Sequence, residues 1–130
     1  MRVADTSLWI AFFSDGDKFH AQAVPLVEDG EPILVPFEVL AETLGVIQAR
    51  YGRSVAREVY RQMVALPHVE VIDEVRLHET RDLWLSAEKN LTWVDAAVVV
   101  LARARAAAVL TFDRDIHATM AESPTREKRS

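Results

Sequence analysis

The chain has 130 residues, half of them hydrophobic, with a formal net charge of −5 and no cysteine. This length and apolar content are typical of one domain with a sizeable core of its own. The composition excludes disulfides, thiolate nucleophiles and cysteine-based metal sites, and the acidic balance disfavours binding of nucleic acid by bulk electrostatics.

No part of the sequence has the features of a signal peptide or a membrane span. Arg2 precedes a short apolar run that Asp5 interrupts, and no run of about 18 uninterrupted apolar residues follows. We therefore expect a cytoplasmic protein that has no membrane partner.

Short apolar segments alternate along the chain with segments of helical periodicity. RVAD at 2–5 is the first expected strand, and SLWIAFF after it is the first expected helix. The later elements alternate in the same way, with strands at 33–36, 68–73 and 107–112 and helices at 19–29, 37–51, 53–66, 74–90 and 91–106. The helix over 74–90 mixes apolar and charged residues and should lie outside, whereas 91–106 is apolar enough for an inner helix.

This alternation predicts an α/β fold, a three-layer α/β/α domain with a central, mostly parallel sheet of four to five strands. The segment after 112 has no apolar run, so a fifth strand at the edge would be weak or missing. We expect a single domain over residues 1–121 and a polar, disordered tail over residues 122–130, ESPTREKRS.

Four carboxylates stand where the ends of these elements meet. Asp5 ends the first strand, and Asp113 lies in the turn TFDRD after the last one. Glu42 lies within the apolar VLAETLGVI, and Asp95 is the only charge in LTWVDAAVVVLA. Each has a purely structural explanation as well: Asp5 and Asp113 as helix caps or turn residues, Asp95 in a capping box with Thr92, and Glu42 as a surface residue.

The joint pattern favours a functional explanation. Sites in open parallel sheets form outside the carboxyl ends of the strands, and all four acids can converge there. Carboxylates this close raise each other's pKa unless a cation joins them. The natural cation is Mg²⁺ or Mn²⁺, which prefers oxygen ligands, and such a site performs phosphoryl chemistry.

Taken together, VADTSLWIA, the helix acid in VLAETLGV, LTWVDAAVVVLA and VLTFDRD resemble the PIN domain, most closely the ribonuclease toxins of VapC type from bacterial toxin–antitoxin pairs. The resemblance covers nearly the whole chain. It implies a catalytic acidic quartet at Asp5, Glu42, Asp95 and Asp113, of which Asp5, Asp95 and Asp113 would bind the metal. Other positions that match the family and would support the site are Thr6, Thr111 and the more variable acid Asp115.

The function that this resemblance implies is an Mg²⁺- or Mn²⁺-dependent endoribonuclease that cleaves structured RNA, tRNA or rRNA rather than mRNA. Arg114, beside the acids, is a candidate for a contact with substrate phosphate. The resemblance also implies a homodimer and a cognate antitoxin. Because one amphipathic helix cannot turn all its aromatic residues inward, we expect Trp9, Phe12 and Phe13 to form part of the antitoxin-binding face.

Two other functions remain open. One is an aspartyl-phosphate phosphatase with Asp5 as nucleophile, but such enzymes need a second Asp where this chain has Ser7. The other is a PIN-like binding module without catalysis, against which the retention of all four acids argues.

Overall fold

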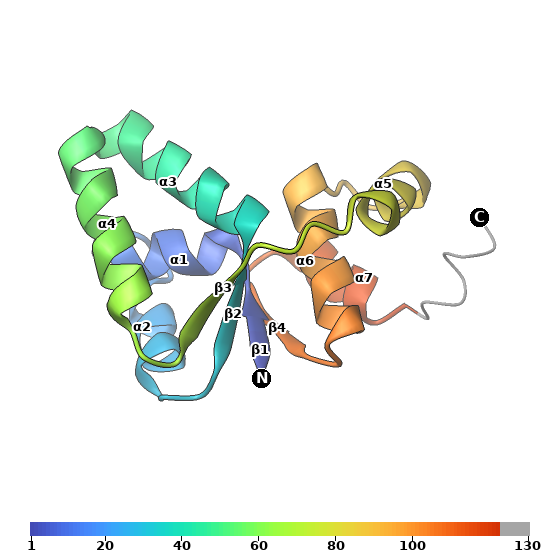
Figure 1. The fold of residues 1–130 in the computed structure, drawn as a ribbon, viewed down its shortest axis with the longest axis horizontal. Coiled ribbons are helices and arrows are strands. Elements are labelled where there is room, and N and C mark those ends of the chain that lie inside the picture. The colour runs from blue at the N-terminus through green and yellow to red at the C-terminus, as the bar shows by residue number, and fades with distance from the viewer. Residues whose placement is uncertain (123–130) are drawn as a thin grey trace.

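A parallel sheet with helices on both sides forms the fold in the computed structural model, which describes residues 1–122 (Figure 1). The strands are β1 (Arg2–Ala4), β2 (Ile33–Pro36), β3 (Val69–Ile72) and β4 (Ala108–Leu110). They lie in the order β3-β2-β1-β4, and every pair is parallel. The predicted three-layer fold is confirmed, with four strands over the described part of the chain. The predicted tail lies outside it, apart from Glu122.

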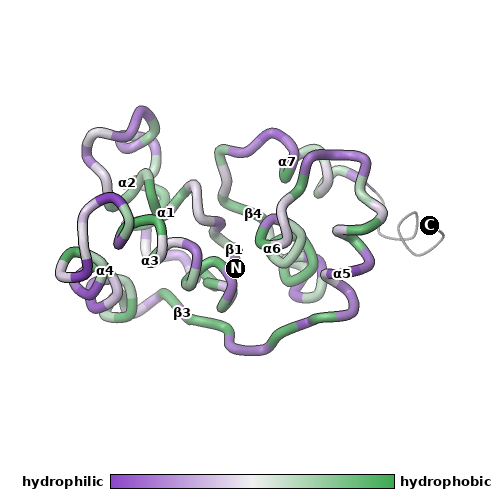
Figure 2. Tube along the Cα trace, turned by 90° about the horizontal axis from the view of Figure 1, so that it is seen from above, coloured by the Kyte–Doolittle hydropathy of each residue, from purple (hydrophilic) through white to green (hydrophobic). Residues whose placement is uncertain are grey.

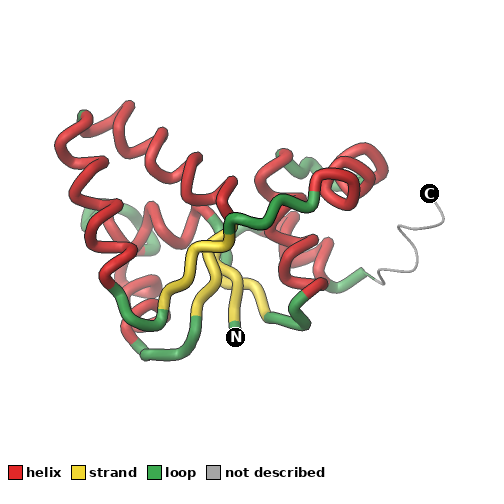
Figure 3. The backbone as a smooth tube through the Cα atoms, in the orientation of Figure 1, coloured by secondary structure: helices red, strands yellow, loops and turns green. Residues whose placement is uncertain are grey.

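The helices are α1 (Thr6–Phe13), α2 (His20–Glu28), α3 (Phe37–Tyr51), α4 (Arg53–Ala65), α5 (Leu77–Ser86), α6 (Trp93–Ala104) and α7 (Arg114–Met120). Figures 1 and 2 place α1–α4 on one side of the sheet and α5–α7 on the other. The loop between β3 and α5 crosses from one side to the other (Figure 3). No helix within residues 1–122 combines the length and the apolar character that crossing a bilayer requires.

The inner elements are those with unbroken apolar sequence. All four residues of β2 are buried, as expected for a parallel strand covered on both faces. Residues 96–102 of α6 are buried in succession, so this helix is covered on all sides, as predicted. On α5 only Thr80 and Leu83 are buried, while Trp84 and Leu85 are exposed, so this helix lies outside, as predicted, and leaves apolar surface uncovered.

The main hydrophobic core lies around β1 and β2, where α1, α2 and α6 pack against them. Trp9 lies in this core with none of its surface exposed. Truncation of such a residue to Ala would cost about 3–5 kcal/mol. Smaller clusters form between α5, α6 and α7 around Leu83 and Ile116, and between α1, α3 and α4 around Ile47 and Val59.

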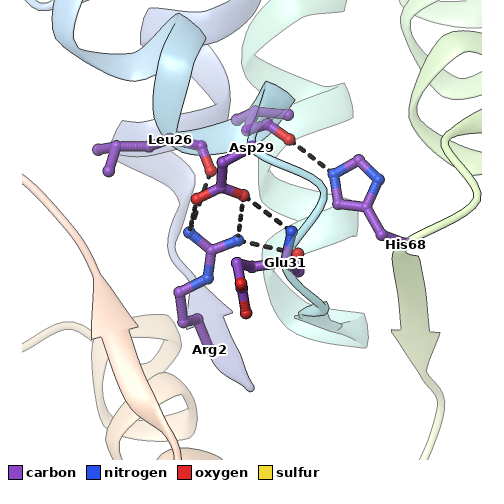
Figure 4. Close-up of polar contacts among 6 residues, drawn as sticks. Arg2, Leu26, Asp29, Glu31 and His68 are labelled. Carbon is purple, nitrogen blue, oxygen red and sulfur yellow. Dashed lines mark hydrogen bonds and ion pairs between the residues drawn. The ribbon is translucent and has the colours of Figure 1, made fainter.

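Arg2 fastens the amino end of the sheet (Figure 4). Its guanidinium donates to both carboxylate oxygens of Asp29, at 2.8 and 2.9 Å, and to the carbonyl oxygens of Leu26 and Glu31, at 3.1 and 2.8 Å. Nearby, Nε2 of His68 lies 2.6 Å from a carbonyl oxygen of α2. We call the Arg2–Asp29 pair, together with the carbonyl groups of Leu26 and Glu31, the amino-end clasp. It ties the connection between α2 and β2 to the start of β1.

Candidate active site

A cavity of about 500 Å³ opens beside the carboxyl ends of the strands. It lies next to the junction of β1 and β4, which are neighbours although the chain passes through β2 and β3 between them. The connections that follow β1 and β4 run to opposite sides of the sheet, and ligands of parallel sheets bind at such a point. The acids predicted from the sequence all line this cavity, namely Asp5, Glu42, Asp95 and Asp113.

Asp5, directly after β1, is held by hydrogen bonds to both of its carboxylate oxygens. Oδ1 accepts from the Ser7 hydroxyl at 2.8 Å and from the backbone N–H of Leu8 at 3.1 Å, and Oδ2 accepts from the Thr111 hydroxyl. Asp5 is therefore the N-cap of α1, yet it also lines the cavity while only 3% exposed. Burial raises the pKa of Asp5, the hydrogen bonds oppose this shift, and the negative charge of Asp95 adds to it.

The hydroxyls that hold Asp5 also hold the turn between β4 and α7. The oxygen of Ser7 accepts from the backbone N–H of Phe112 at 3.1 Å, and the oxygen of Thr111 accepts from that of Asp113 at 2.9 Å. Nε2 of His117 lies 2.9 Å from the carbonyl oxygen of Thr111. The turns after β1 and β4 are thus joined through side chains, and each fixes the other.

Asp95 and Asp113 each use one carboxylate oxygen to cap a helix. Oδ2 of Asp95 accepts from the backbone N–H of Thr92 at 3.0 Å and completes a capping box at the start of α6. Oδ1 of Asp113 accepts from the backbone N–H groups of Asp115 and Ile116, at 2.8 and 3.1 Å, at the start of α7. The second oxygen of each carboxylate has no hydrogen-bond partner within residues 1–122.

Asp95 is the acid on which the charges of neighbouring acids act most clearly. Burial raises the pKa of Asp95, and the negative charges of Asp113 and Glu42 raise it further, against the hydrogen bonds from Thr92. Over the described residues, none of the four acids forms a salt bridge. The cavity therefore brings four carboxylates together, and none of them is in a salt bridge with a described side chain.

This donor set fits a hard divalent cation that keeps much of its water shell. The available donors are carboxylate oxygens, together with the Thr6 hydroxyl, which is buried without a hydrogen-bond partner. Among the residues described, no three Asp, Glu or His side chains form a group that could hold a metal ion by themselves. Mg²⁺ binds through one or two carboxylates and retains several waters, so it does not need such a group.

The structure separates the supporting residues expected from the sequence. Thr6 lines the cavity and Thr111 binds Asp5, whereas Asp115 and Arg114 are not among the lining residues. Arg114 is exposed at the first position of α7. It lies next to the acids in sequence but outside the cavity that they line.

Trp9 corrects the expectation for the antitoxin-binding face. Its side chain is fully buried, because the sheet and neighbouring helices cover more of α1 than one amphipathic face. Phe12 and Phe13 are half-buried and pack against Trp9, with ring centroids 6.1 Å from its ring in both cases. Only these two aromatic residues of the predicted face retain exposed surface.

Several lining residues had no predicted role in the site. Asp17, Lys18 and Phe19 come from the connection between α1 and α2, where the sequence SDGDK indicated only a break. Arg50 enters from the last turn of α3, and Phe112 directly precedes Asp113. The position of Phe112 beside a predicted acid was the one signal that could have indicated its role, since loop residues show no periodicity.

A family model for the PIN domain matches residues 2–122. VapC20 of Mycobacterium tuberculosis, described as a sarcin-ricin loop cleaving toxin, is 25% identical with a TM-score of 0.79, over 92% of this chain and 95% of that chain. PAE2754 from Pyrobaculum aerophilum is 20% identical, with a TM-score of 0.65, over 98% of this chain and 94% of that chain.

In VapBC2 from Rickettsia felis, solved with a DNA fragment from its promoter, the matching chain is 15% identical. Its TM-score is 0.67, over 90% of this chain and 91% of that chain, and it shows the same fold. No curated protein matches the chain. The family model covers nearly all of the described residues, and the chain therefore belongs to the PIN domain family.

Proposed function

We propose that this protein is a metal-dependent endoribonuclease and the toxin of a type II toxin–antitoxin pair of the VapBC kind. The observation that carries the proposal is the convergence of four carboxylates without salt-bridge partners, within residues 1–122, on one cavity beside β1 and β4. The similarity to VapC20, a sarcin-ricin loop cleaving toxin, supports RNA as the substrate. The similarity to VapBC2, a complex solved with promoter DNA, supports an antitoxin partner.

Asp5, Asp95 and Asp113 are the residues that would hold Mg²⁺ or Mn²⁺, directly or through water. Such an ion, when bound, lowers the pKa of water and neutralises charge that develops on the reacting phosphoryl group. Asp5 supplies a carboxylate whose position is fixed by its hydrogen bonds to Ser7, Leu8 and Thr111. Asp95 and Asp113 each supply the oxygen that their helix caps leave free.

Glu42 has a different task in this proposal. It lies on α3, lines the cavity and, among the described residues, accepts no hydrogen bond. Its carboxylate can therefore orient the attacking water in line with the bond to be broken. Attack on phosphorus with loss of the 3′ oxygen leaves a 5′-phosphate on the downstream RNA.

The substrate in this proposal is structured RNA, tRNA or rRNA rather than mRNA, in the cytoplasm. The antitoxin places a cation near the acids, because a guanidinium can engage carboxylates through two hydrogen bonds. A homodimer is supported by the exposed apolar residues in and before α5, a kind of surface that homodimers bury. These residues are Val75, Leu77, Trp84 and Leu85.

Sequencing of RNA 5′-phosphate ends after induced expression tests the nuclease function. Expression of the wild-type chain should create new 5′-phosphate ends at a small number of sites in tRNA or rRNA, and Asp95→Asn should create none. Purified protein should reproduce these cuts with Mg²⁺ or Mn²⁺ and lose them with a chelator. If wild type and Asp95→Asn give the same ends, the proposal is wrong.

A non-catalytic PIN module is the second candidate, because Asp5, Asp95 and Asp113 all cap helices and could be retained for folding alone. Glu42 caps nothing, so it separates the two functions. Loss of cleavage in Glu42→Gln with unchanged thermal stability supports the nuclease. The phosphatase has little support, since Ser7 stands where such an enzyme needs a second Asp, and its hydroxyl donates to Asp5.

A further inference from the structure

An aromatic and cationic wall stands beside the acids. Phe19, from the connection between α1 and α2, stacks on Phe112 with ring centroids 4.5 Å apart and planes 7° from parallel. Nζ of Lys18 lies 5.0 Å from the centroid of Phe19. Arg50, from the last turn of α3, lines the same cavity. These four residues are called the stacking wall below.

The cations of the stacking wall differ from five arginines elsewhere in residues 1–122, which have acidic partners. Arg2, Arg61, Arg76, Arg81 and Arg105 are in salt bridges. Lys18 and Arg50 have no acidic partner within 4.0 Å among residues 1–122, although the cavity that they line also holds the acidic quartet. They are therefore available to an anionic ligand that enters this cavity.

The two rings are also placed for a ligand. Phe19 and Phe112 are half-buried and line the cavity, so part of the stacked pair is accessible from it. Phe112 directly precedes Asp113, so a flat group on this pair would lie beside the acidic quartet. Aromatic rings beside basic side chains are the combination that binds unpaired nucleotides, because every base has a face that can stack and a backbone phosphate.

We propose that the stacking wall binds one unstacked nucleotide of a single-stranded RNA segment next to the scissile bond. Its base packs on the part of the Phe19–Phe112 pair that the cavity exposes, and its flanking phosphates contact Lys18 and Arg50. This inference rests on the proposed nuclease function, which supplies the RNA. A base within a duplex is stacked on both faces and cannot reach the pair, so the site selects loops, bulges and ends.

The size of the cavity agrees with a single nucleotide. Pockets for small ligands commonly measure about 300–1,000 Å³, and this one measures about 500 Å³. The alternative is that the stacked rings merely fasten the connection between α1 and α2 to the turn after β4. A Leu substitution separates these roles, because Leu preserves apolar packing but offers no flat π face.

The test is the binding of a fluorescein-labelled single-stranded oligouridine, about twelve nucleotides long, compared with the same strand annealed to its complement. The Asp95→Asn background keeps the probe intact in Mg²⁺. Phe19→Leu and Phe112→Leu should each weaken single-strand binding by about tenfold without changing its salt dependence. Arg50→Gln and Lys18→Gln should each reduce the slope of log affinity against log salt by about 0.7.

Matched controls lie outside the cavity. Phe37→Leu, Arg53→Gln and Lys89→Gln alter exposed residues that do not line it, and they should bind the single strand as the background does. Thermal melting identifies variants that lose the fold, and Phe19→Leu replaces Phe112→Leu if the latter unfolds. Equal affinity for strand and duplex, or unchanged affinity and salt slope in all four wall variants, would overturn the inference.

Binding and cleavage separate this inference from the proposed function. If the wild-type chain cleaves RNA but the wall variants bind the oligouridine normally, the nuclease function stands and the stacking wall does not. If binding depends on the wall but no RNA is cleaved with any divalent metal, the stacking wall is a single-strand-binding site, and the nuclease function fails together with the scissile bond that the inference places beside the wall.

Discussion

Carboxylates at the two ends of the sheet differ in their hydrogen-bond donors and in the direction of their pKa shifts. In the amino-end clasp, Asp29 receives the guanidinium of Arg2, and these hydrogen bonds lower the pKa of Asp29. At the carboxyl end, Asp5 and Asp95 receive only neutral donors, and burial raises the pKa of both. An acid paired with a cation favours the fold, whereas clustered acids without a cation oppose it and are typical of functional sites.

The largest expected effect is on catalysis at the carboxyl end. Asp95→Asn should reduce RNA cleavage by more than about 100-fold, which exceeds the usual cost of losing a residue that merely supports a metal ligand. The melting temperature should stay the same or rise, because Asn preserves the shape and the cap but removes a repelled charge. Cleavage assays and thermal melting measure the two outcomes. Unfolding of the variant would make capping the main role of Asp95, and normal cleavage would exclude a metal role.

The opposite result is expected at the amino end. Arg2→Met should lower the melting temperature by roughly 3–8 °C, because it removes the bonds to Asp29 and to two carbonyl oxygens. Cleavage per folded molecule should remain unchanged. A variant that melts normally but cleaves poorly would mean that the clasp acts on the site and that the two ends are not independent.

The pH dependence of stability should have opposite signs at the two ends. The usual pKa of Asp is 3.8, and the folded-state pKa of Asp29 is lower. Asp29 therefore stabilises the fold above pH 3.8, and this stabilisation is lost as the pH falls through the lowered pKa. The folded-state pKa of Asp95 is higher than 3.8. Its contribution to the stability of the fold is therefore present below pH 3.8 and is lost as the pH rises through the raised pKa.

Melting curves between about pH 3 and 7 test these signs. Relative to wild type, Asp29→Asn should lose most stability near neutral pH and least in acid. Asp95→Asn should show its gain near neutral pH, where the wild-type carboxylate is charged. Parallel curves for both variants would contradict the contrast between the ends.

The smallest expected effect is that of the metal on stability. Added Mg²⁺ should raise the melting temperature of metal-free protein by a few degrees, since a ligand that binds only the folded state stabilises it by mass action. Asp95→Asn should lose this shift, while Asp29→Asn should retain it. An equal shift in both variants would place the ion elsewhere.

Prediction from the sequence succeeded where composition alone determines burial. The unbroken apolar runs at 33–36 and in α6 could only be inner elements, and acids at the ends of parallel strands had to lie near one rim. The structural and functional explanations of these acids proved compatible, because capping uses only one carboxylate oxygen of Asp95 and of Asp113.

The remaining features depend on tertiary contacts that short-range patterns do not contain. The seven residues of α7 are too few for a clear period, and the helix depends on the Asp113 cap and the burial of Ile116 and Thr119. The rule that an amphipathic helix buries one face predicts an exposed Trp9, but Trp9 is fully buried because α1 is covered on several sides. Lys18 lines the cavity from the loop between α1 and α2. The position of this loop depends on how the two helices pack, which the loop sequence does not indicate.

The pairing of β1 with β4 determines when the site can exist during synthesis. The hydrogen bond between Thr111 and Asp5 joins residues 106 positions apart, and chains are made from the amino end. Asp5 is therefore synthesised long before Thr111, and it gains the hydrogen bond from Thr111 only when β4 has emerged from the ribosome. For the proposed nuclease, an unfinished chain that ends before β4 lacks Thr111 and Asp113 and therefore cannot assemble the acidic site.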